Sequence, residues 1–278
     1  MTNLKIGLLH PGAMGVTIGA AALVDGSPVG WASNGRSEAT RERAAAHPFE
    51  DLKSVDALVQ WSDVILSVCP PHAALELAQS VADAGFSGIY VDANAVSPAT
   101  AHAVQEVVEA DGASFVDGGI IGPPAHQVGT TRLYLSGERA AQIAQCFDRS
   151  PLHAIAIGEQ PGAASALKMC YAAYTKGSSA LLLAICALAK AQGVDEALRE
   201  EWEISQPGLA DRANGAARGS APKAWRFEGE MREIAATFQA AGLPGGFHEG
   251  AAELYHMLAG FKDSEAPTLE EVVATLLA

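Results

Sequence analysis

This chain of 278 residues has few cysteines and few basic residues, and each shortage excludes certain classes of protein. The four cysteines show no CxxC spacing, which indicates reduced thiols in a reducing compartment. Only 18 basic residues stand against 32 acidic ones, and a formal net charge of −14 would repel nucleic acid and anionic membranes. An anionic ligand would therefore have to be held by local groups.

Other absences exclude further classes of protein. We find no apolar run long enough to cross a bilayer, and no basic segment followed by an apolar core at the start. We therefore expect a cytoplasmic protein with no membrane partner. Neither a GxSxG elbow nor a Walker loop occurs. The composition, 49% hydrophobic and 18% charged, suits one large globular domain or two.

The motif with the most informative surroundings lies at 10–15 and reads HPGAMG. An apolar run at 4–9, typical of a buried parallel strand, precedes it, and a helix-like run from about 13 to 24 follows it. Strand, glycine turn and helix are the context of a dinucleotide-binding fingerprint. The usual first glycine of that fingerprint is missing, because His10 stands in its place. An ordinary glycine turn is the alternative interpretation.

The remaining residues of the motif have expected parts in cofactor binding. Gly12 has no Cβ, so its backbone would let a pyrophosphate approach closely. The helix start at Ala13 and Met14 would point free N–H groups at the negative charge. Gly15 would let the helix pack tightly on the strand.

A carboxylate is missing at the end of the second predicted strand, 29–33, where an NAD site needs one for the ribose 2′-hydroxyl. Polar and basic residues stand there instead: Asn34, Arg36 and Ser37, with Arg41 and Arg43 on the following helix. A guanidinium matches a phosphate bidentately, so the segment predicts a 2′-phosphate pocket and favours NADP (NADPH) over NAD. A solvated helix start with scattered arginines is the alternative.

Further apolar runs predict the rest of a mostly parallel sheet, with strands at 64–68, 88–92, 114–117, 133–136 and 153–157. Ligands of open α/β sheets bind outside the carboxyl ends of the strands. We therefore expect the cofactor cleft to include the residues that follow two of these strands: Cys69, Pro70, Pro71 and Asn94. The segment 118–124 is expected to be a loop that faces the same cleft.

The character of the sequence changes after residue 162. From 163 to 192 there is no proline and a single glycine, which predicts a helix of roughly 45 Å. Everything downstream is predicted to be helical, over 194–204, 208–216, 225–241, 247–261 and 268–277. The predicted fold is an α/β Rossmann domain with a doubly wound sheet at 1–160, joined by the long helix to an all-α domain at 161–278. The small-residue-rich helix also suggests a homodimer with interlocked helical domains.

Lys168 is a lone lysine in an apolar stretch near the start of the long helix. Burial of its ammonium would be costly unless it reached a polar site, and a snorkelling surface lysine is the alternative. Because the helix begins where the sheet ends, its first turns should border the cofactor cleft. Tyr171 and Thr175 lie three and seven residues further on and share the face of Lys168, so we expect them near the substrate.

Another set of side chains raises the question of a metal. These residues recur at helical spacing near the end of the chain: His248, Glu249, Glu253 and His256. No cysteine or aspartate completes the set, and solvated helix charges account for it better. We predict no metal site.

Taken together, these motifs resemble those of the β-hydroxyacid dehydrogenase superfamily, which includes 3-hydroxyisobutyrate dehydrogenase and the N-terminal domain of 6-phosphogluconate dehydrogenase. The resemblance covers nearly the whole chain and rests on segments 12–15, 69–71, 92–98, 117–122 and 162–168. Segments 225–231 and 245–248 resemble a branch whose helical domain is classed as of unknown function.

The resemblance implies hydride transfer between a nicotinamide and a carbinol carbon, with Lys168 in the place of the family's catalytic lysine. Its ammonium would protonate the forming alkoxide in reduction, or the neutral amine would take the proton in oxidation. Desolvation by Ala166, Leu167 and Met169 would lower the pKa of this amine.

Two departures from the family pattern affect the substrate. Ala172 stands where the family has an asparagine, so Tyr171 or Tyr174 would have to replace that donor.

The family's carboxylate-binding Ser-Gly-Gly loop aligns with Ile121, Gly122 and Pro123, which offer neither a side-chain donor at the first position nor a backbone N–H at the last. This loop is similar to that of imine reductases, which share the architecture and the NADP pocket. Lys168, in contrast, favours alcohol–carbonyl chemistry, so we expect an oxidoreductase acting on a hydroxyacid or an aldehyde–alcohol pair. Reduction of a cyclic imine and a non-catalytic NADP-binding sensor are the alternatives.

Overall fold

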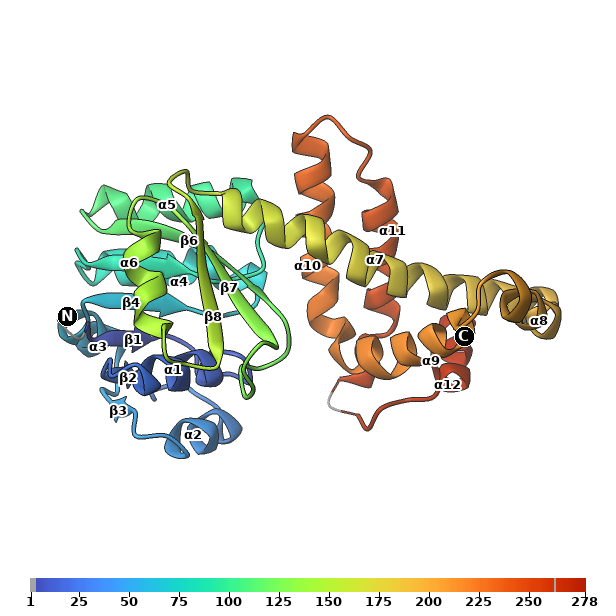
Figure 1. The fold of residues 1–278 in the computed structure, drawn as a ribbon, viewed down its shortest axis with the longest axis horizontal. Helices are drawn as coiled ribbons and strands as arrows, with labels where there is room; N and C mark the ends of the chain where they lie inside the picture. Colours follow the sequence, from blue (N-terminus) through green and yellow to red (C-terminus); the bar gives the residue numbers. More distant parts are fainter. Residues whose placement is uncertain (1–3, 263) are drawn as a thin grey trace. The chain divides into compact units, whose positions relative to one another are not determined.

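The computed structural model describes residues 4–262 and 264–278 and divides into two compact units, Met1–Lys168 and Met169–Ala278. The first unit is α/β and the second is helical (Figure 1). The division falls inside the long helix α7 (Ala163–Gln192), some residues after the boundary expected from the sequence. The reason is that the first turn of α7 is hydrogen-bonded to the sheet, as described below.

Eight strands form the sheet of the first unit, in the order β3-β2-β1-β4-β5-β6-β7-β8. Their bounds are β1 (Ile6–Leu8), β2 (Val29–Trp31), β3 (Glu50–Asp51), β4 (Val64–Ser67), β5 (Ile89–Asp92), β6 (Ser114–Ile121), β7 (Thr131–Ser136) and β8 (Leu152–Gly158). Neighbouring strands run parallel except β6 and β7, which are antiparallel. The mostly parallel, doubly wound sheet predicted from the sequence is confirmed.

Two details of the sheet differ from the prediction. The two-residue edge strand β3 was not expected. The expectation of a loop starting at residue 118 was wrong, because β6 continues to Ile121 and pairs Gly118 with Leu135 and Ile121 with Arg132 of β7. Backbone pairing with β7 therefore keeps the segment in a strand, although Gly118 and Gly119 favour a loop.

Helices cover both faces of the sheet, with these bounds: α1 (Gly15–Val24), α2 (Glu38–Ala45), α3 (Val55–Trp61), α4 (Ala74–Asp83), α5 (Pro98–Ala110) and α6 (Ala140–Ala144), with short 3₁₀ turns η1 (Pro71–Ala73) and η2 (Gln145–Phe147). Alternate residues of β4 show why both faces are apolar. Val64 and Leu66 join the core cluster of α1 and α6, whereas Ile65 joins that of α3, α4 and α5. Successive strand side chains point to opposite faces, so a sheet buried on both sides needs a continuous apolar run.

The second unit is helical throughout the part that the structure describes, as predicted. After α7 come α8 (Asp195–Ser205), α9 (Leu209–Ser220), η3 (Ala221–Lys223), α10 (Ala224–Ala240), α11 (Gly246–Met257), η4 (Ala259–Phe261) and α12 (Leu269–Leu276). Helix α12 begins with a capping box, in which Thr268 and Glu271 exchange side-chain and backbone hydrogen bonds.

Helix α7 corrects one expectation from the sequence. Its length and composition would allow it to cross a membrane, although no such run was expected. Of its most apolar 18-residue window, 44% is buried inside the protein. The core helices of globular proteins can be as long and as apolar, so one such helix is weak evidence for a membrane segment.

A buried carboxylate fixes the start of α7 on the sheet. Asp117 of β6 is fully buried; its Oδ2 accepts from the backbone N–H of Ser165 at 2.9 Å and its Oδ1 from the Ser165 hydroxyl at 2.5 Å. The Ser136 hydroxyl donates to the same carboxylate at 2.9 Å and accepts from the N–H of Ala164 at 3.0 Å. The first N–H groups of a helix lack partners within the helix, and a negative charge there is stabilising.

A glycine allows the close approach that this anchor requires. A Cβ added to Gly119 would lie 2.8 Å from the carbonyl oxygen of Ala164 and 3.0 Å from the Cβ of Lys168. Helix α7 therefore packs directly against the backbone of β6, and Lys168 starts from a fixed position beside that strand.

We expect Asp117→Asn to lower the free energy of unfolding by about 2 kcal/mol, because the charge that accepts three hydrogen bonds is lost while the shape is kept. Urea unfolding followed by circular dichroism measures this. Asp83→Asn is the matched control, since Asp83 is exposed and accepts from Gln79 within one helix; its effect should stay within about 0.5 kcal/mol. Equal effects of the two substitutions would contradict the anchoring role.

Candidate active site

The strand order of the first unit reverses between β1 and β4, and ligands of doubly wound sheets bind at such a point. His10 follows β1, Cys69 follows β4 and Asn94 follows the next strand, β5. Three neighbouring strands thus bring the glycine turn, Cys69 and Asn94 to one edge of the sheet.

The turn at 10–15 has space on one side and tight packing on the other. A Cβ added to Gly12 would meet no atom within 4 Å, which leaves room for a ligand to approach its backbone. A Cβ on Gly15 would lie 2.1 Å from the carbonyl oxygen of His10, so only glycine fits there. Helix α1 begins at Gly15 with Met14 as its N-cap, and Ala13 precedes that cap, so the helix starts slightly later than predicted.

His10 and Arg36 form a pair that the sequence did not suggest. The Nε2 of His10 is hydrogen-bonded to the Nη1 of Arg36. Burial and the neighbouring charge of Arg36 lower the pKa of His10 to about 4, so the imidazole is neutral at pH 7 and accepts this bond. Two further buried atoms of the pair, Nδ1 of His10 and Nε of Arg36, have no hydrogen-bond partner among the described residues.

The other residues predicted for the 2′-phosphate lie close to Arg36 in the sequence. Asn34 is exposed, and Ser37 is the N-cap of α2, where its hydroxyl accepts from the N–H of Thr40. Arg41 is exposed and donates from Nη2 to the carbonyl of Ser33 at 3.3 Å.

Arg43 of α2 was grouped from the sequence with the basic residues near the 2′-phosphate. It donates from Nε to the carbonyl of Pro11 at 3.4 Å and from Nη2 to the hydroxyl of Thr40 at 3.0 Å. It thereby ties α2 to the glycine turn. Pro11 lies 32 positions away in sequence, so no local pattern could have revealed this contact.

Asn94 connects the ends of β4 and β5 by hydrogen bonds. Its Oδ1 accepts from the N–H of Cys69 at 2.5 Å, and its Nδ2 donates to the hydroxyl of Ser67 at 3.0 Å. Burial and the nearby charge of Asp92 raise the pKa of the Cys69 thiol to about 12, so it is not a thiolate at neutral pH. The chain then continues through Pro70 and Pro71 into the turn η1.

Lys168 is held at the carboxyl end of β6. It is half-buried and donates from Nζ to the carbonyl of Ile120 at 2.7 Å, so its ammonium is not a solvated surface group. The predicted substrate residues Ile121, Gly122 and Pro123 follow directly. Ile121 is buried, whereas Gly122, with a φ of +126°, and Pro123 are exposed.

The other two predicted substrate residues belong to the second unit. Tyr171 is 45% exposed, and Thr175 donates its hydroxyl to the carbonyl of Tyr171 at 3.2 Å. Ala172 is buried, and the hydroxyl of Tyr174 accepts from Arg212 at 3.4 Å. A part for Tyr171 and Thr175 in binding stays a prediction.

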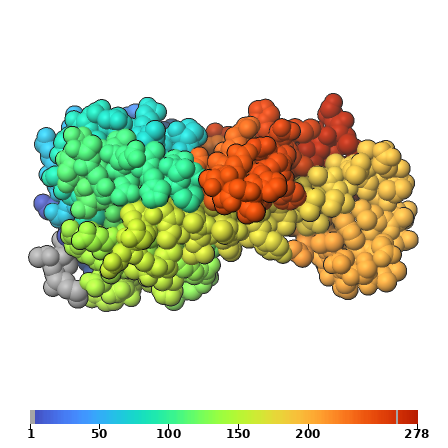
Figure 2. Space-filling model, turned by 90° about the horizontal axis from the view of Figure 1, so that it is seen from above, coloured from blue at the N-terminus to red at the C-terminus, as the bar shows by residue number. Residues whose placement is uncertain are grey.

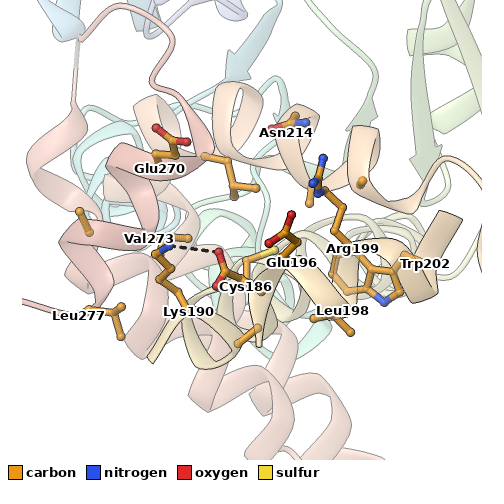
Figure 3. Close-up of a pocket in the computed structure, with 16 residues that line it drawn as sticks. Cys186, Lys190, Glu196, Leu198, Arg199, Trp202, Asn214, Glu270, Val273 and Leu277 are labelled. Atoms are coloured by element: carbon orange, nitrogen blue, oxygen red, sulfur yellow. Dashed lines mark hydrogen bonds and ion pairs between the residues drawn. The ribbon is translucent and has the colours of Figure 1, made fainter. Parts of the chain in front are cut away.

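The helical unit contains a pocket of about 810 Å³ between α7, α8, α9 and α12 (Figure 3). Arg199 and Trp202 line it, together with Lys190, which pairs with Asp195 at 3.1 Å. None of the residues predicted to bind cofactor or substrate, or to act in catalysis, lines this pocket.

No group of three His, Cys, Asp or Glu side chains is placed to hold a metal within 4–262 and 264–278. His248 is buried against the rings of Phe238 and Phe247, and this burial lowers its pKa. His256 instead pairs with Glu228 at 3.0 Å. The two histidines considered for a metal are thus engaged separately.

Comparisons with known proteins agree with this architecture. Residues 189–258 match the family model "Domain of unknown function (DUF1932)". An uncharacterised 28.5 kDa protein of Methanothermus fervidus is 30% identical over 203 residues, which is 73% of this chain and 78% of that protein. The conserved protein MTH1747, of unknown function and structurally similar to 3-hydroxyacid dehydrogenases, is 27% identical, with a TM-score of 0.69 over 93% of this chain and 98% of that chain.

Two more distant structures share the fold. The 3-hydroxyisobutyrate dehydrogenase of Mycobacterium tuberculosis, solved with L-serine, is 19% identical, with a TM-score of 0.71 over 99% of both chains. A reductive aminase of Aspergillus terreus, solved with NADPH and ethyl levulinate, is 17% identical, with a TM-score of 0.59 over 98% of this chain and 99% of that chain. The chain therefore belongs to the family of the Methanothermus fervidus protein. Its fold is similar to that of 3-hydroxyacid dehydrogenases, as the sequence predicted, and part of its helical unit matches the DUF1932 model.

Proposed function

We propose that this protein is an NADP-dependent oxidoreductase that transfers hydride between a nicotinamide and a hydroxyacid or aldehyde–alcohol substrate. One observation carries the proposal: the same unit holds the Lys168 ammonium at the end of β6 and an open glycine turn whose His10 is hydrogen-bonded to Arg36. The relation to 3-hydroxyacid dehydrogenases supports a nicotinamide cofactor.

The residues at the end of β2 fit the extra phosphate of NADP. Arg36 carries a charge that no carboxylate of the described residues neutralises, and its buried Nε has no partner. Gly12 leaves space for a pyrophosphate beside the turn. A chain of net charge −14 needs such a local concentration of positive charge to hold a polyanion.

The role of Lys168 is to move a proton at the substrate oxygen. When bound, the nicotinamide supplies or accepts the hydride at carbon. In reduction, Lys168 donates a proton from Nζ to the oxygen on which negative charge develops; in oxidation its neutral amine takes the hydroxyl proton. The carbonyl of Ile120 orients the amine by accepting a hydrogen bond from Nζ at 2.7 Å.

Reduction of a cyclic imine is the second candidate. The segment Ile121–Pro123 favours it, because the first side chain is apolar and buried and the last residue has no N–H. A site without those donors would bind a small carboxylate poorly. Screening NADPH oxidation against keto acids, aldehydes and cyclic imines distinguishes the two candidates.

Lys168→Ala should lower kcat/KM by about 10²- to 10⁴-fold, because a positioned proton donor is lost, while the Kd for NADPH stays within about threefold. Steady-state kinetics and fluorescence titration measure the two quantities. Lys190→Ala is the control on the same helix, since Lys190 is 60% exposed and pairs with Asp195. Unchanged turnover in Lys168→Ala would contradict the catalytic role of Lys168, whereas a wild-type protein that binds NADPH but turns over none of the screened substrates would support the non-catalytic sensor.

Arg36→Ala should raise the Kd for NADPH by about 10- to 100-fold, because a charge-assisted bond to the 2′-phosphate is lost. The Kd for NADH should change little, and titration of both cofactors tests this. Arg149→Ala is the control, since Arg149 is exposed and pairs with Asp25 at 2.8 Å. An equal loss for both cofactors would reject the 2′-phosphate role.

The protein forms a homodimer in this proposal, through the exposed face of α7. Large apolar residues recur there at alternating intervals of three and four positions, as in paired helices: Tyr174, Leu181, the half-buried Ile185 and Leu188, with Ser178 between them. Leu181 is 45% exposed and Leu188 61%. Figure 2 shows atoms of α7, in yellow, at the molecular surface. A second copy would cover this uncharged stripe with its own.

Replacing Leu181 and Leu188 together by glutamate should convert a dimer into a monomer, because two charges would be buried at the helix pairing. Multi-angle light scattering at micromolar concentration measures the mass. Leu243→Glu is the control, since Leu243 is 54% exposed outside α7 and should leave the mass unchanged. A monomeric wild-type protein would contradict the dimer.

A further inference from the structure

We propose that His10 is a specificity-determining residue, which holds the Arg36 guanidinium at the glycine turn and thereby selects dinucleotides that carry a 2′-phosphate. The inference rests on the proposed cofactor and concerns a residue that takes the place of a fingerprint glycine. His10 acts through Arg36, so it is a positioning residue.

The fold brings the two residues together from adjacent strands. His10 follows β1 and Arg36 follows β2, and these strands pair in parallel with Leu8 opposite Trp31. Twenty-six positions separate the two side chains, yet Nε2 of His10 is bonded to Nη1 of Arg36. A glycine at position 10 would offer no side chain to the guanidinium, which would then depend on solvent for its orientation.

A neutral imidazole suits this position better than a carboxylate. An acidic partner would also orient Arg36, but it would cancel the charge that attracts a phosphate. The imidazole accepts a hydrogen bond without contributing a negative charge, because burial and Arg36 keep its pKa near 4. The nearby Cys69 thiol is neutral as well, since its pKa is raised to about 12.

The geometry leaves donors for a ligand. Nε of Arg36 is buried without a partner among the described residues, so the bond to His10 does not exhaust the guanidinium. Arg43 separately ties the turn to α2 through the carbonyl of Pro11. Holding a long, flexible arginine before binding reduces the ordering cost that a ligand must overcome. His10 therefore pre-organises the site for the 2′-phosphate.

The test compares NADP⁺ with NAD⁺, which differ only by the 2′-phosphate, in calorimetric titrations of the full chain. His10→Ala should weaken NADP⁺ binding by about tenfold and leave NAD⁺ within about twofold, as expected for losing one orienting hydrogen bond. His10→Gln should restore the preference, because its amide oxygen can reach the position of Nε2, whereas the shorter His10→Asn should not. In an Arg36→Ala background, His10→Ala should have no further effect.

His153→Ala on β8 is the control, since His153 is exposed on the strand at the far edge of the sheet and should change neither affinity. An unchanged NADP⁺ preference in His10→Ala overturns this inference while the proposed cofactor stands. Equal weakening of both dinucleotides also overturns it, because it indicates a structural role of the turn. A wild-type protein without any preference for NADP⁺ refutes the cofactor and this inference together. If His10→Ala does not fold, the contrast between the glutamine and asparagine variants decides.

Discussion

The buried carboxylate of Asp117 is the interaction on which the candidate site depends. It joins three elements, because it accepts from Ser165 at the start of α7 and from Ser136 of β7 while lying on β6. A buried charge is costly unless it is hydrogen-bonded, and here three donors satisfy it. The first turn of a long helix is thereby fixed to the sheet, and Lys168 is placed one turn later at the carbonyl of Ile120.

Much of the fold could be predicted because its signals are local. Apolar runs such as 64–67 mark strands that are buried on both faces, and a proline-free stretch marks α7 with the bounds that the structure shows. The edge strand β3 could not be predicted, since two polar residues carry no periodicity. The end of β6 was missed because Gly118 and Gly119 suggest a loop, whereas pairing with β7 extends the strand.

The candidate site was predictable in its residue types but not in its contacts. The glycine turn, Arg36 and Lys168 were selected from sequence context, and their roles remain predictions. The hydrogen-bond partners could not be predicted, because Asp117 contacts a residue 48 positions away in the sequence and His10 contacts one 26 positions away. Such contacts depend on which strands lie side by side, which is a property of the whole sheet.

The anchor at the start of α7 also fixes the angular position of Lys168. Each residue of an α-helix turns the chain by about 100° and advances it by about 1.5 Å. Ser165 is clamped to the sheet, so the three residues that follow set the direction of the lysine amine. Insertion or deletion of a single residue in that interval would swing the amine far from the carbonyl of Ile120 with little disturbance to the core. The number of residues between Ser165 and Lys168 is therefore more tightly constrained than their identity.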